Sequence, residues 1–230
     1  MLEAFARFPK PHLLLDPLEE LAHVPVVDAA VQEVLGPRYG LWSSSIFLSE
    51  PGTGTGFSWH QDALHYDIAN WAAGTVRVWI AMTDSTLENG TMWYAPGTHD
   101  TEFRRHVRDP ATDELAVDPE DVPEHRVPVV LQRGQFSLHD LRLLHCSGRN
   151  SSSGRRLNVA LDFVAPECAP GPGCQGVRGL TDGFTDRPWQ AEARGSTLPS
   201  DQRHAQFVKA SGRRIKSMMQ MAGPPANGAN

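Results

Sequence analysis

The feature that most constrains the fold is a series of short β-branched and aromatic segments between residues 39 and 164. Such residues favour strands, and Gly, Pro, Asn and Asp turns separate the segments. Eight segments are predicted strands: Leu41–Leu48, Gly56–Asp62, Thr75–Asp84, Thr91–Ala95, Arg126–Leu131, Gly134–His139, Leu143–Ser147 and Arg156–Val164. Many short strands without intervening helices predict a jelly roll or barrel and not alternating β-α units.

Helical periodicity is confined to the two ends of the chain. Residues 1–36 are predicted to be mostly helical, because Val27–Leu35 repeats apolar residues at helical spacing and Gly36 is a favourable C-terminal stop. A second helix is predicted at Ser200–Met219. Three longer stretches are polar or rich in Gly and Pro, and they are expected to form loops or lids: 63–74, 100–125 and 166–200.

Length and composition favour one globular domain. The chain has 230 residues, of which 40% are hydrophobic and 21% charged, which is ordinary for a domain that buries a core without disulfides. We predict a single domain over residues 1–220 with its core at about 39–166. A disordered tail is predicted at 221–230.

Charge and cysteine content argue against several kinds of partner. The net charge of −6 gives no basic surface for a nucleic acid or an anionic membrane. The three cysteines form no C-x-x-C pair, and neither a signal peptide nor a membrane-spanning apolar run is predicted. We expect a cytoplasmic protein with a small-molecule substrate and no nucleic-acid or membrane partner. The oligomeric state is left open.

An H-x-D motif is the first candidate for chemistry. His60 and Asp62 stand two positions apart in a predicted strand. Residues two apart on a strand project from the same face, so both could reach one metal ion while Gln61 points elsewhere. Two His and one carboxylate leave three coordination positions open, which is the arrangement that non-haem iron oxygenases need. The motif is therefore a candidate for two of these three ligands.

The second histidine could come from either of two predicted strands. His145 follows the apolar pair at 143–144 and precedes polar turn residues, as expected at the rim of a strand. His139 lies in a similar strand, but the interruption at Asp140 predicts a turn before His145. His145 is the preferred ligand, and His139 is its rival.

Arg156 opens the last predicted strand, 11 residues after His145. A guanidinium group can bind a carboxylate through two parallel hydrogen bonds, and a hydroxyl such as that of Ser147 could add another donor. Such a pair would hold the far end of a dicarboxylate whose 2-oxo acid end binds the metal. The alternative is that Arg156, like its neighbour Arg155, is a solvated residue at a strand end.

Longer motifs connect these residues. The segments HQD at 60–62, WIAMTDSTLENGTM at 79–92 and APGTH at 95–99 are followed by GQFSLH at 134–139 and HCSGRNSSSGRR at 145–156. Together they resemble the phytanoyl-CoA dioxygenase family over roughly residues 41–166. The resemblance implies a mainly β fold, the double-stranded β-helix (a cupin-like jelly roll), with flanking helices.

The resemblance also implies an enzyme, an Fe(II)- and 2-oxoglutarate-dependent dioxygenase that uses O2. It implies that His60, Asp62 and His145 are the iron ligands. Four residues match positions that contact 2-oxoglutarate: Gln61, Trp79, Ser147 and Arg156. Related halogenases carry a small residue at the position of Asp62, so oxidation, most simply hydroxylation of an unactivated carbon, is favoured over halogenation.

The substrate is predicted from side-chain type alone. Five aromatic residues in the expected lids and strands could give apolar contacts: Trp42, Tyr66, Trp71, Trp93 and Trp189. The lid segments have no Lys/Arg-rich run to hold the phosphates of coenzyme A. A small, mostly apolar molecule of secondary metabolism is therefore favoured. An acyl-CoA hydroxylase, a cupin-like protein with another metal and a non-catalytic binding protein are the alternatives.

Overall fold

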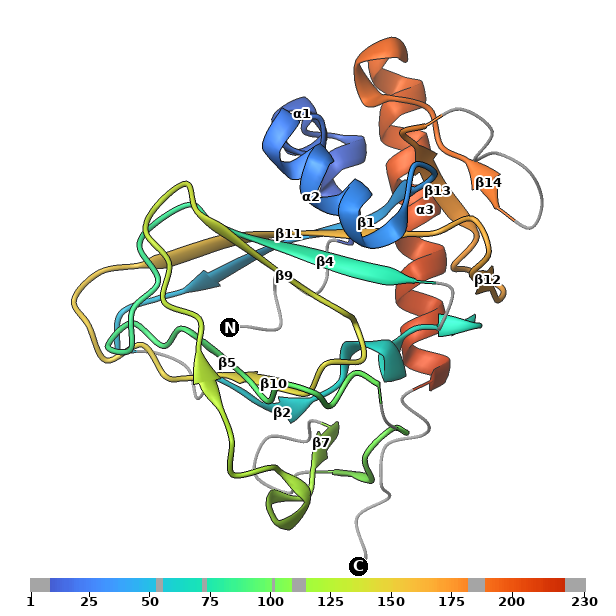
Figure 1. The fold of residues 1–230 in the computed structure, drawn as a ribbon. Helices are drawn as coiled ribbons and strands as arrows, with labels where there is room; N and C mark the ends of the chain where they lie inside the picture. The colour runs from blue at the N-terminus through green and yellow to red at the C-terminus, as the bar shows by residue number, and fades with distance from the viewer. Residues whose placement is uncertain are drawn as a thin grey trace, which may run out of the picture.

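The computed structural model describes residues 9–52, 56–71, 74–100, 102–108, 115–181 and 189–221. A six-stranded sheet in the order β14-β13-β1-β11-β4-β9 faces a four-stranded sheet in the order β2-β10-β5-β8 (Figure 1). The strands of the larger sheet are β1 (Gly40–Ser49), β4 (Thr75–Ala81), β9 (Phe136–His139), β11 (Arg156–Val164), β13 (Gly176–Gly179) and β14 (Gln190–Ala191). The strands of the smaller sheet are β2 (Phe57–His60), β5 (Met92–Tyr94), β8 (Val127–Pro128) and β10 (His145–Ser147). The predicted jelly roll is confirmed.

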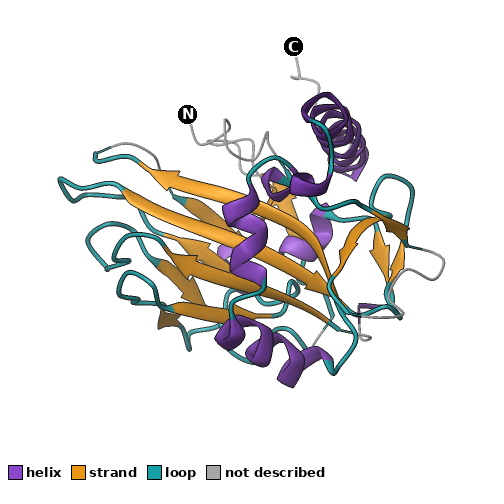
Figure 2. Cartoon of the chain, turned by 90° about the horizontal axis from the view of Figure 1, so that it is seen from above, coloured by secondary structure: helices purple, strands orange, loops and turns teal. Residues whose placement is uncertain are grey.

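Helices cover the outside of the larger sheet (Figure 2). They are α1 (Asp16–Ala22), α2 (Pro25–Leu35) and, beside β13 and β14, α3 (Ser200–Met221). The short 3-10 helices are η2 (Pro11–Leu13), η3 (Asp62–His65), η5 (Pro119–Asp121) and η6 (Gly195–Thr197). Among the described residues, no helix is both long and apolar enough to cross a membrane.

The central strands β4 and β11 present different side chains on their two faces. The outward residues are apolar, and Val78 and Leu161 share one buried cluster with Val31 of α2. The intervening residues face the smaller sheet, since Trp79 packs in one cluster with Met92 of β5. Because side chains alternate along a strand, the polar residues that separate the apolar ones are directed between the two sheets. The candidate site lies there.

The predicted strands are all present, with one important difference at β2. The sequence predicted a strand through Asp62, but β2 ends at His60. The chain turns into η3 at this point, and the Ala63 amide donates a hydrogen bond to the Leu141 carbonyl oxygen at 2.9 Å. The prediction that His60 and Asp62 project from one face of a strand is therefore wrong, although both reach the same place.

The three predicted loop segments contain regular structure. The first includes η3 and β3 (Ile68–Ala69), and the second contains η5 and the hairpin of β6 (His106–Arg108) and β7 (Leu115–Val117). The third supplies β12 (Ala169–Pro170), β13 and β14. Since β13 pairs with β1, the larger sheet continues beyond residue 166, where the core was predicted to end.

The helical predictions at both ends are confirmed within the described residues. The N-terminal segment forms α1 and α2, while residues 1–8 lie outside the described part of the chain. The predicted helix at Ser200–Met219 corresponds to α3 and extends to Met221. The rest of the predicted tail, 222–230, also lies outside the described residues.

Two glycine turns adopt left-handed backbone angles, with φ of +77° at Gly90 and +84° at Gly97. A Cβ atom at Gly90 would lie 2.3 Å from the Gly148 carbonyl oxygen, whereas at Gly97 it would meet nothing within 4 Å. Gly148 directly follows β10, the strand that begins at His145. The close approach of two backbones at Gly90 therefore helps to fix the position of a strand that carries a candidate ligand.

We expect Gly97→Ala to lower the free energy of unfolding by about 1 kcal/mol, from left-handed strain alone. Gly90→Ala should lower it by at least about 2 kcal/mol more, because a backbone carbonyl must also move. Urea unfolding of the two variants measures the difference. Equal losses of unfolding free energy in the two variants would mean that the Gly148 backbone moves without an energetic cost.

Candidate metal centre

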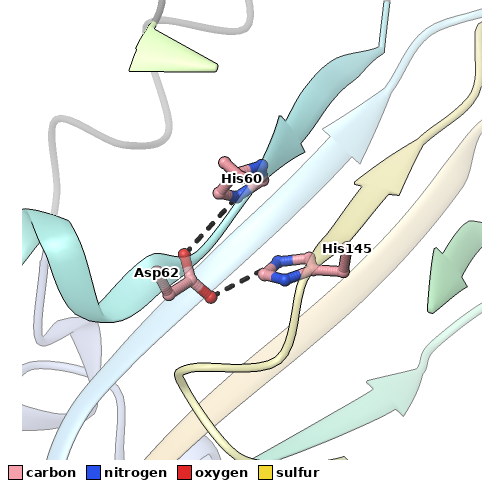
Figure 3. A group of neighbouring side chains, drawn as sticks. All are labelled: His60, Asp62 and His145. Atoms are coloured by element: carbon pink, nitrogen blue, oxygen red, sulfur yellow. Dashed lines mark ion pairs between the residues drawn. The ribbon is translucent and has the colours of Figure 1, made fainter. Parts of the chain in front are cut away.

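His60, Asp62 and His145 converge between the two sheets (Figure 3). His60 ends β2 and His145 begins β10, and the two are direct partners in the antiparallel pairing. Asp62 lies beside both: its Oδ1 is 3.6 Å from His60 Nε2, and its Oδ2 is 3.4 Å from His145 Nε2. One ligand atom from each residue lies within 4.8 Å of the others, so a single ion could contact all three.

Backbone carbonyl groups orient both imidazole rings. His60 Nδ1 lies 2.7 Å from the Ser58 carbonyl oxygen, and His145 Nδ1 lies 2.9 Å from that of Leu143. A carbonyl oxygen can only accept, so in the neutral ring Nδ1 carries the proton and Nε2 presents a lone pair. Hydrogen bonds of this kind orient metal-binding histidines. The same contact, made to the residue two positions earlier in the chain, prepares both rings as ligands.

Burial and neighbouring charges set the protonation of the site. Burial alone would raise the pKa of the Asp62 carboxyl, but Arg77 and then His145 hold it well below its usual range. Burial, with the nearby His60, lowers the pKa of His145 to about 4. Burial acts in the same direction on His60, but its contact with Asp62 outweighs burial and raises the pKa. At neutral pH the site therefore offers an ionised carboxylate and a neutral His145.

Arg77 of β4 connects the candidate carboxylate to the larger sheet. Its Nη1 donates to Asp62 Oδ2, and its Nε donates to Asp162 Oδ1 at 2.6 Å. Its Nη2 donates to Asp162 Oδ2 and to the Tyr66 hydroxyl, both at 3.1 Å. All four residues are buried. Neither Arg77 nor Asp162 was predicted from the sequence, although a charged residue flanked by apolar neighbours in each of two predicted strands was a usable signal.

His139, the rival ligand, is buried beside the centre but is not one of the three converging residues. Its ring centroid is 5.2 Å from that of His145, and its Nδ1 lies 2.7 Å from the Tyr94 hydroxyl. Its Nε2 is buried and has no hydrogen-bond partner among the described residues. A buried nitrogen without a partner costs about 1–3 kcal/mol, so the geometry suits an additional polar group next to the metal position.

Arg156 is buried, in contrast to a solvated residue at a strand end. Its Nε donates to the Asn89 carbonyl oxygen at 3.1 Å and its Nη1 to Asn158 Oδ1 at 2.9 Å, and both acceptors are neutral. Burial lowers its pKa to about 10. The adjacent Arg155 is exposed and pairs with Glu50 at 2.8 Å. A buried guanidinium whose described partners are neutral is suited to bind an anion.

Gln61 is fully buried between the two candidate ligands of the H-x-D motif. Its side-chain Nε2 donates to the Arg142 carbonyl oxygen at 2.7 Å, and its Oε1 accepts from the Arg104 amide at 2.9 Å. Its backbone amide donates to Nε2 of His106, a half-buried residue of β6 in the 100–125 segment that was predicted to form a loop or lid. These contacts hold neighbouring segments against the site. The contact of Gln61 with 2-oxoglutarate stays a prediction.

The other two residues predicted at the co-substrate site lie on strands that border the interior. Trp79 packs against Phe47, with ring centroids 4.9 Å apart. Ser147 Oγ accepts a hydrogen bond from the Phe57 amide at 3.0 Å. Both have structural contacts, and their contacts with 2-oxoglutarate also stay predictions.

Most of the aromatic residues that were predicted to contact a substrate belong to the core. Trp42, Tyr66 and Trp189 are buried in one cluster, and Trp71 packs against it. Trp93 is half-buried on β5. The aromatic side chains of this cluster therefore stabilise the fold, and they do not support an apolar substrate.

Comparison with known proteins identifies the family. Residues 8–158 match the sequence profile of the family described as phytanoyl-CoA dioxygenase. The chain belongs to the phytanoyl-CoA dioxygenase family. Members of this family are Fe(II)- and 2-oxoglutarate-dependent oxygenases, and the predicted fold and family are both confirmed.

Similar proteins include a dioxygenase that is named for a small molecule and a monooxygenase of known structure. A probable alpha-ketoglutarate-dependent hypophosphite dioxygenase of Stutzerimonas stutzeri is 30% identical over 180 residues, which is 73% of this chain and 60% of that protein. The apo structure of the non-haem monooxygenase ThoJ is 32% identical, with a TM-score of 0.84 over 96% of this chain and 82% of that one. A ThoJ–nickel complex is 30% identical, with a TM-score of 0.76 over 93% of this chain and 79% of that one. The chain spans 48 to 60% of the length of three curated relatives that it matches.

We expect His60→Ala, Asp62→Ala and His145→Ala each to lose bound Fe(II), because each removes one of three converging ligand atoms. His139→Ala should retain the metal, because His139 lies outside this group. Anaerobic equilibrium dialysis with metal analysis measures the bound iron, and circular dichroism verifies the fold. Full retention of iron by His145→Ala, with loss in His139→Ala, would move the second ligand to His139.

Proposed function

We propose that this protein is an Fe(II)- and 2-oxoglutarate-dependent dioxygenase that oxidises, most simply by hydroxylation, an unactivated carbon of a small free molecule. Family membership and the geometry of the His-Asp-His group support the metal. The observation that carries the proposal is Arg156, a buried guanidinium with neutral partners that begins the strand containing Asp162. In this proposal the His-Asp-His group would be a cation site and Arg156 an anion site, both on the inner side of one sandwich.

The roles of the residues follow from their chemistry. His60, Asp62 and His145 would hold the iron, and Arg156 would bind the distal carboxylate of 2-oxoglutarate. When bound, iron supplies the activation of O2 that is coupled to conversion of 2-oxoglutarate to succinate and carbon dioxide. The protein contributes orientation and the exclusion of water, since Asp62, His145 and Arg156 are all buried.

The alternative functions fit the site less well. A structural zinc site usually closes with four ligands, and the converging group contains three among the described residues. A cupin-like protein that uses another metal would have no need of a buried guanidinium at Arg156. The intact His-Asp-His group argues against a binding protein that has lost its activity. Asp62 is a carboxylate where related halogenases carry a small residue, so oxidation is favoured over halogenation.

Arg156→Gln should weaken 2-oxoglutarate binding without loss of the metal. A charge-assisted hydrogen bond contributes about 1.5–3 kcal/mol, so the Kd for 2-oxoglutarate should rise roughly 10- to 150-fold. Isothermal titration with 2-oxoglutarate under anaerobic conditions measures this change in the iron-loaded protein. Iron affinity, measured separately by dialysis, should change little.

Arg155→Gln is the matched control, because Arg155 is adjacent in sequence but 69% exposed and paired with Glu50. This variant should bind 2-oxoglutarate as the wild type does. If Arg156→Gln binds 2-oxoglutarate normally and Arg155→Gln does not, the anchor is Arg155. Absence of succinate from the wild type supplied with Fe(II), O2, 2-oxoglutarate and a broad substrate panel would contradict the proposed activity.

For the substrate, we propose a free molecule of the secondary-metabolite type and not an acyl-CoA thioester. Coenzyme A carries several phosphate charges, which need cationic side chains that are free to bind them. Near the segments that contact Gln61, Arg105 is paired with Asp118 and Arg142 with Asp140. Arg104, whose Nε lacks a hydrogen-bond partner among the described residues, is a single cation against several phosphate charges. The hypophosphite dioxygenase that this chain resembles is named for a small free substrate, which agrees with the proposal.

Substrate-stimulated O2 uptake tests this choice. Acyl-CoA esters, the corresponding free acids, amino acids and apolar metabolites are compared in the presence of Fe(II) and 2-oxoglutarate. We expect stimulation by a free molecule and none by the thioesters. Strong stimulation by an acyl-CoA, with none by its free acid, would establish the alternative substrate class.

A further inference from the structure

We propose that Arg77 is a positioning residue for the metal centre: it holds the Asp62 carboxylate in its ligand orientation and links that orientation to the larger sheet. The inference rests on the proposed iron site and names a residue outside the His-Asp-His group. Its basis is the hydrogen bond from Arg77 Nη1 to Asp62 Oδ2, together with the unequal support that the three candidate ligands receive.

The two histidines have support that Asp62 lacks. His60 and His145 are paired across β2 and β10, and a backbone carbonyl group fixes each ring. Asp62 lies outside the sheets, at the first residue of the four-residue helix η3. A single 3-10 turn constrains its side chain weakly, because such helices are short and their hydrogen bonds are poorly aligned. The orientation of the carboxylate therefore depends on the groups that contact it.

Arg77 is well placed to supply this constraint. It lies on β4, between β11 and β9, and it is directly opposite Asp162 of β11 in the pairing. Nε and Nη2 bind the two oxygens of Asp162 at 2.6 and 3.1 Å, and Nη2 also donates to the Tyr66 hydroxyl. This bidentate contact fixes the plane of the guanidinium group, which leaves Nη1 directed at Asp62.

A purely structural ion pair is the competing explanation. A variant that keeps the positive charge at residue 77 but loses the planar guanidinium group separates the two explanations. Removal of the charge would leave Asp62 and Asp162 buried without a cation, which would disturb both folding and metal binding. Lysine keeps the charge but has one ammonium group in place of a planar fork, so it cannot hold both carboxylates in the same geometry. Arg77→Lys therefore changes mainly the orientation of Asp62.

The test uses the metal-free full chain titrated with Mn(II), with free Mn(II) followed by electron paramagnetic resonance. We expect Arg77→Lys to weaken Mn(II) binding by about 10- to 100-fold, the usual effect of losing a group that orients a metal ligand. Co(II) binding gives a second readout, because the absorption spectrum of bound Co(II) should differ from that of the wild type when the carboxylate is reoriented. A structural role alone would lower thermal stability and leave both metal readouts unchanged.

Asp162→Asn tests the same link from its other end. Asp162 contacts Arg77 and is not one of the converging metal-binding residues. Its substitution should nevertheless weaken Mn(II) binding at least about fivefold, because the guanidinium group of Arg77 would be held less firmly. The two effects should be less than additive in the double variant, since both act through the orientation of Asp62. This variant also gives an answer if Arg77→Lys does not fold.

Arg178→Lys is the matched control, because Arg178 Nε also binds a buried carboxylate, that of Glu19, at 2.9 Å. This variant should lose stability but bind Mn(II) as the wild type does. Normal Mn(II) binding and an unchanged Co(II) spectrum in both Arg77→Lys and Asp162→Asn would overturn the inference and leave the proposed function intact. A wild-type chain that binds no Mn(II) would overturn the inference together with the metal site on which the proposed function depends.

Discussion

The guanidinium group of Arg77 lies between two carboxylates in the interior of the sandwich, and the arrangement of the site depends on this contact. A buried ion pair is a poor means of stabilising a fold, because the desolvation of its charges offsets much of their attraction. Apolar side chains of similar volume would stabilise the strands equally well. The cluster also has unequal charge, since Asp62 and Asp162 carry two negative charges against one positive charge on Arg77. With His145 neutral, the excess negative charge raises the pKa of His60, and a divalent cation beside Asp62 would take the place of that proton. The charges are therefore better explained by metal binding than by stability.

The two faces of the central strands separate folding from chemistry. Outward residues such as Val78 and Leu161 pack beneath the helices and supply apolar burial. The inward-facing residues of the same strands include Arg77, Asp162 and Arg156. Because side chains alternate along a strand, a change on the inner face leaves the outer packing in place. This division allows a set of charged side chains, which would destabilise a sandwich with two apolar faces, to persist in an otherwise well-packed domain.

Much of the fold and site could be predicted from the sequence because the relevant signals are local. Strand segments can be predicted from their β-branched and aromatic composition. The residues His60, Asp62 and His145 belong to motifs that can be recognised even where the predicted end of a strand is wrong. The same-face argument for the first pair was nevertheless wrong, since the turn at Asp62 depends on a hydrogen bond to the distant Leu141. Arg77 was missed because its partners are brought together only by strand pairing. The buried aromatic cluster was misinterpreted because sequence does not show whether a side chain packs inside or lines an opening.

The distribution of charge between the sheets also has a consequence for the order of binding. Near the metal position two carboxylates, Asp62 and Asp162, face Arg77 and a His60 ring whose pKa is raised, whereas Arg156 presents a buried positive charge with neutral partners. A dicarboxylate that entered the metal-free site would gain from Arg156 at one end and find no excess positive charge at the other. A divalent cation held by His60, Asp62 and His145 would displace the proton of His60 and add a net positive charge at that end. A bound metal would therefore make the interior more favourable for the second carboxylate of 2-oxoglutarate, so electrostatics would favour binding of the metal first.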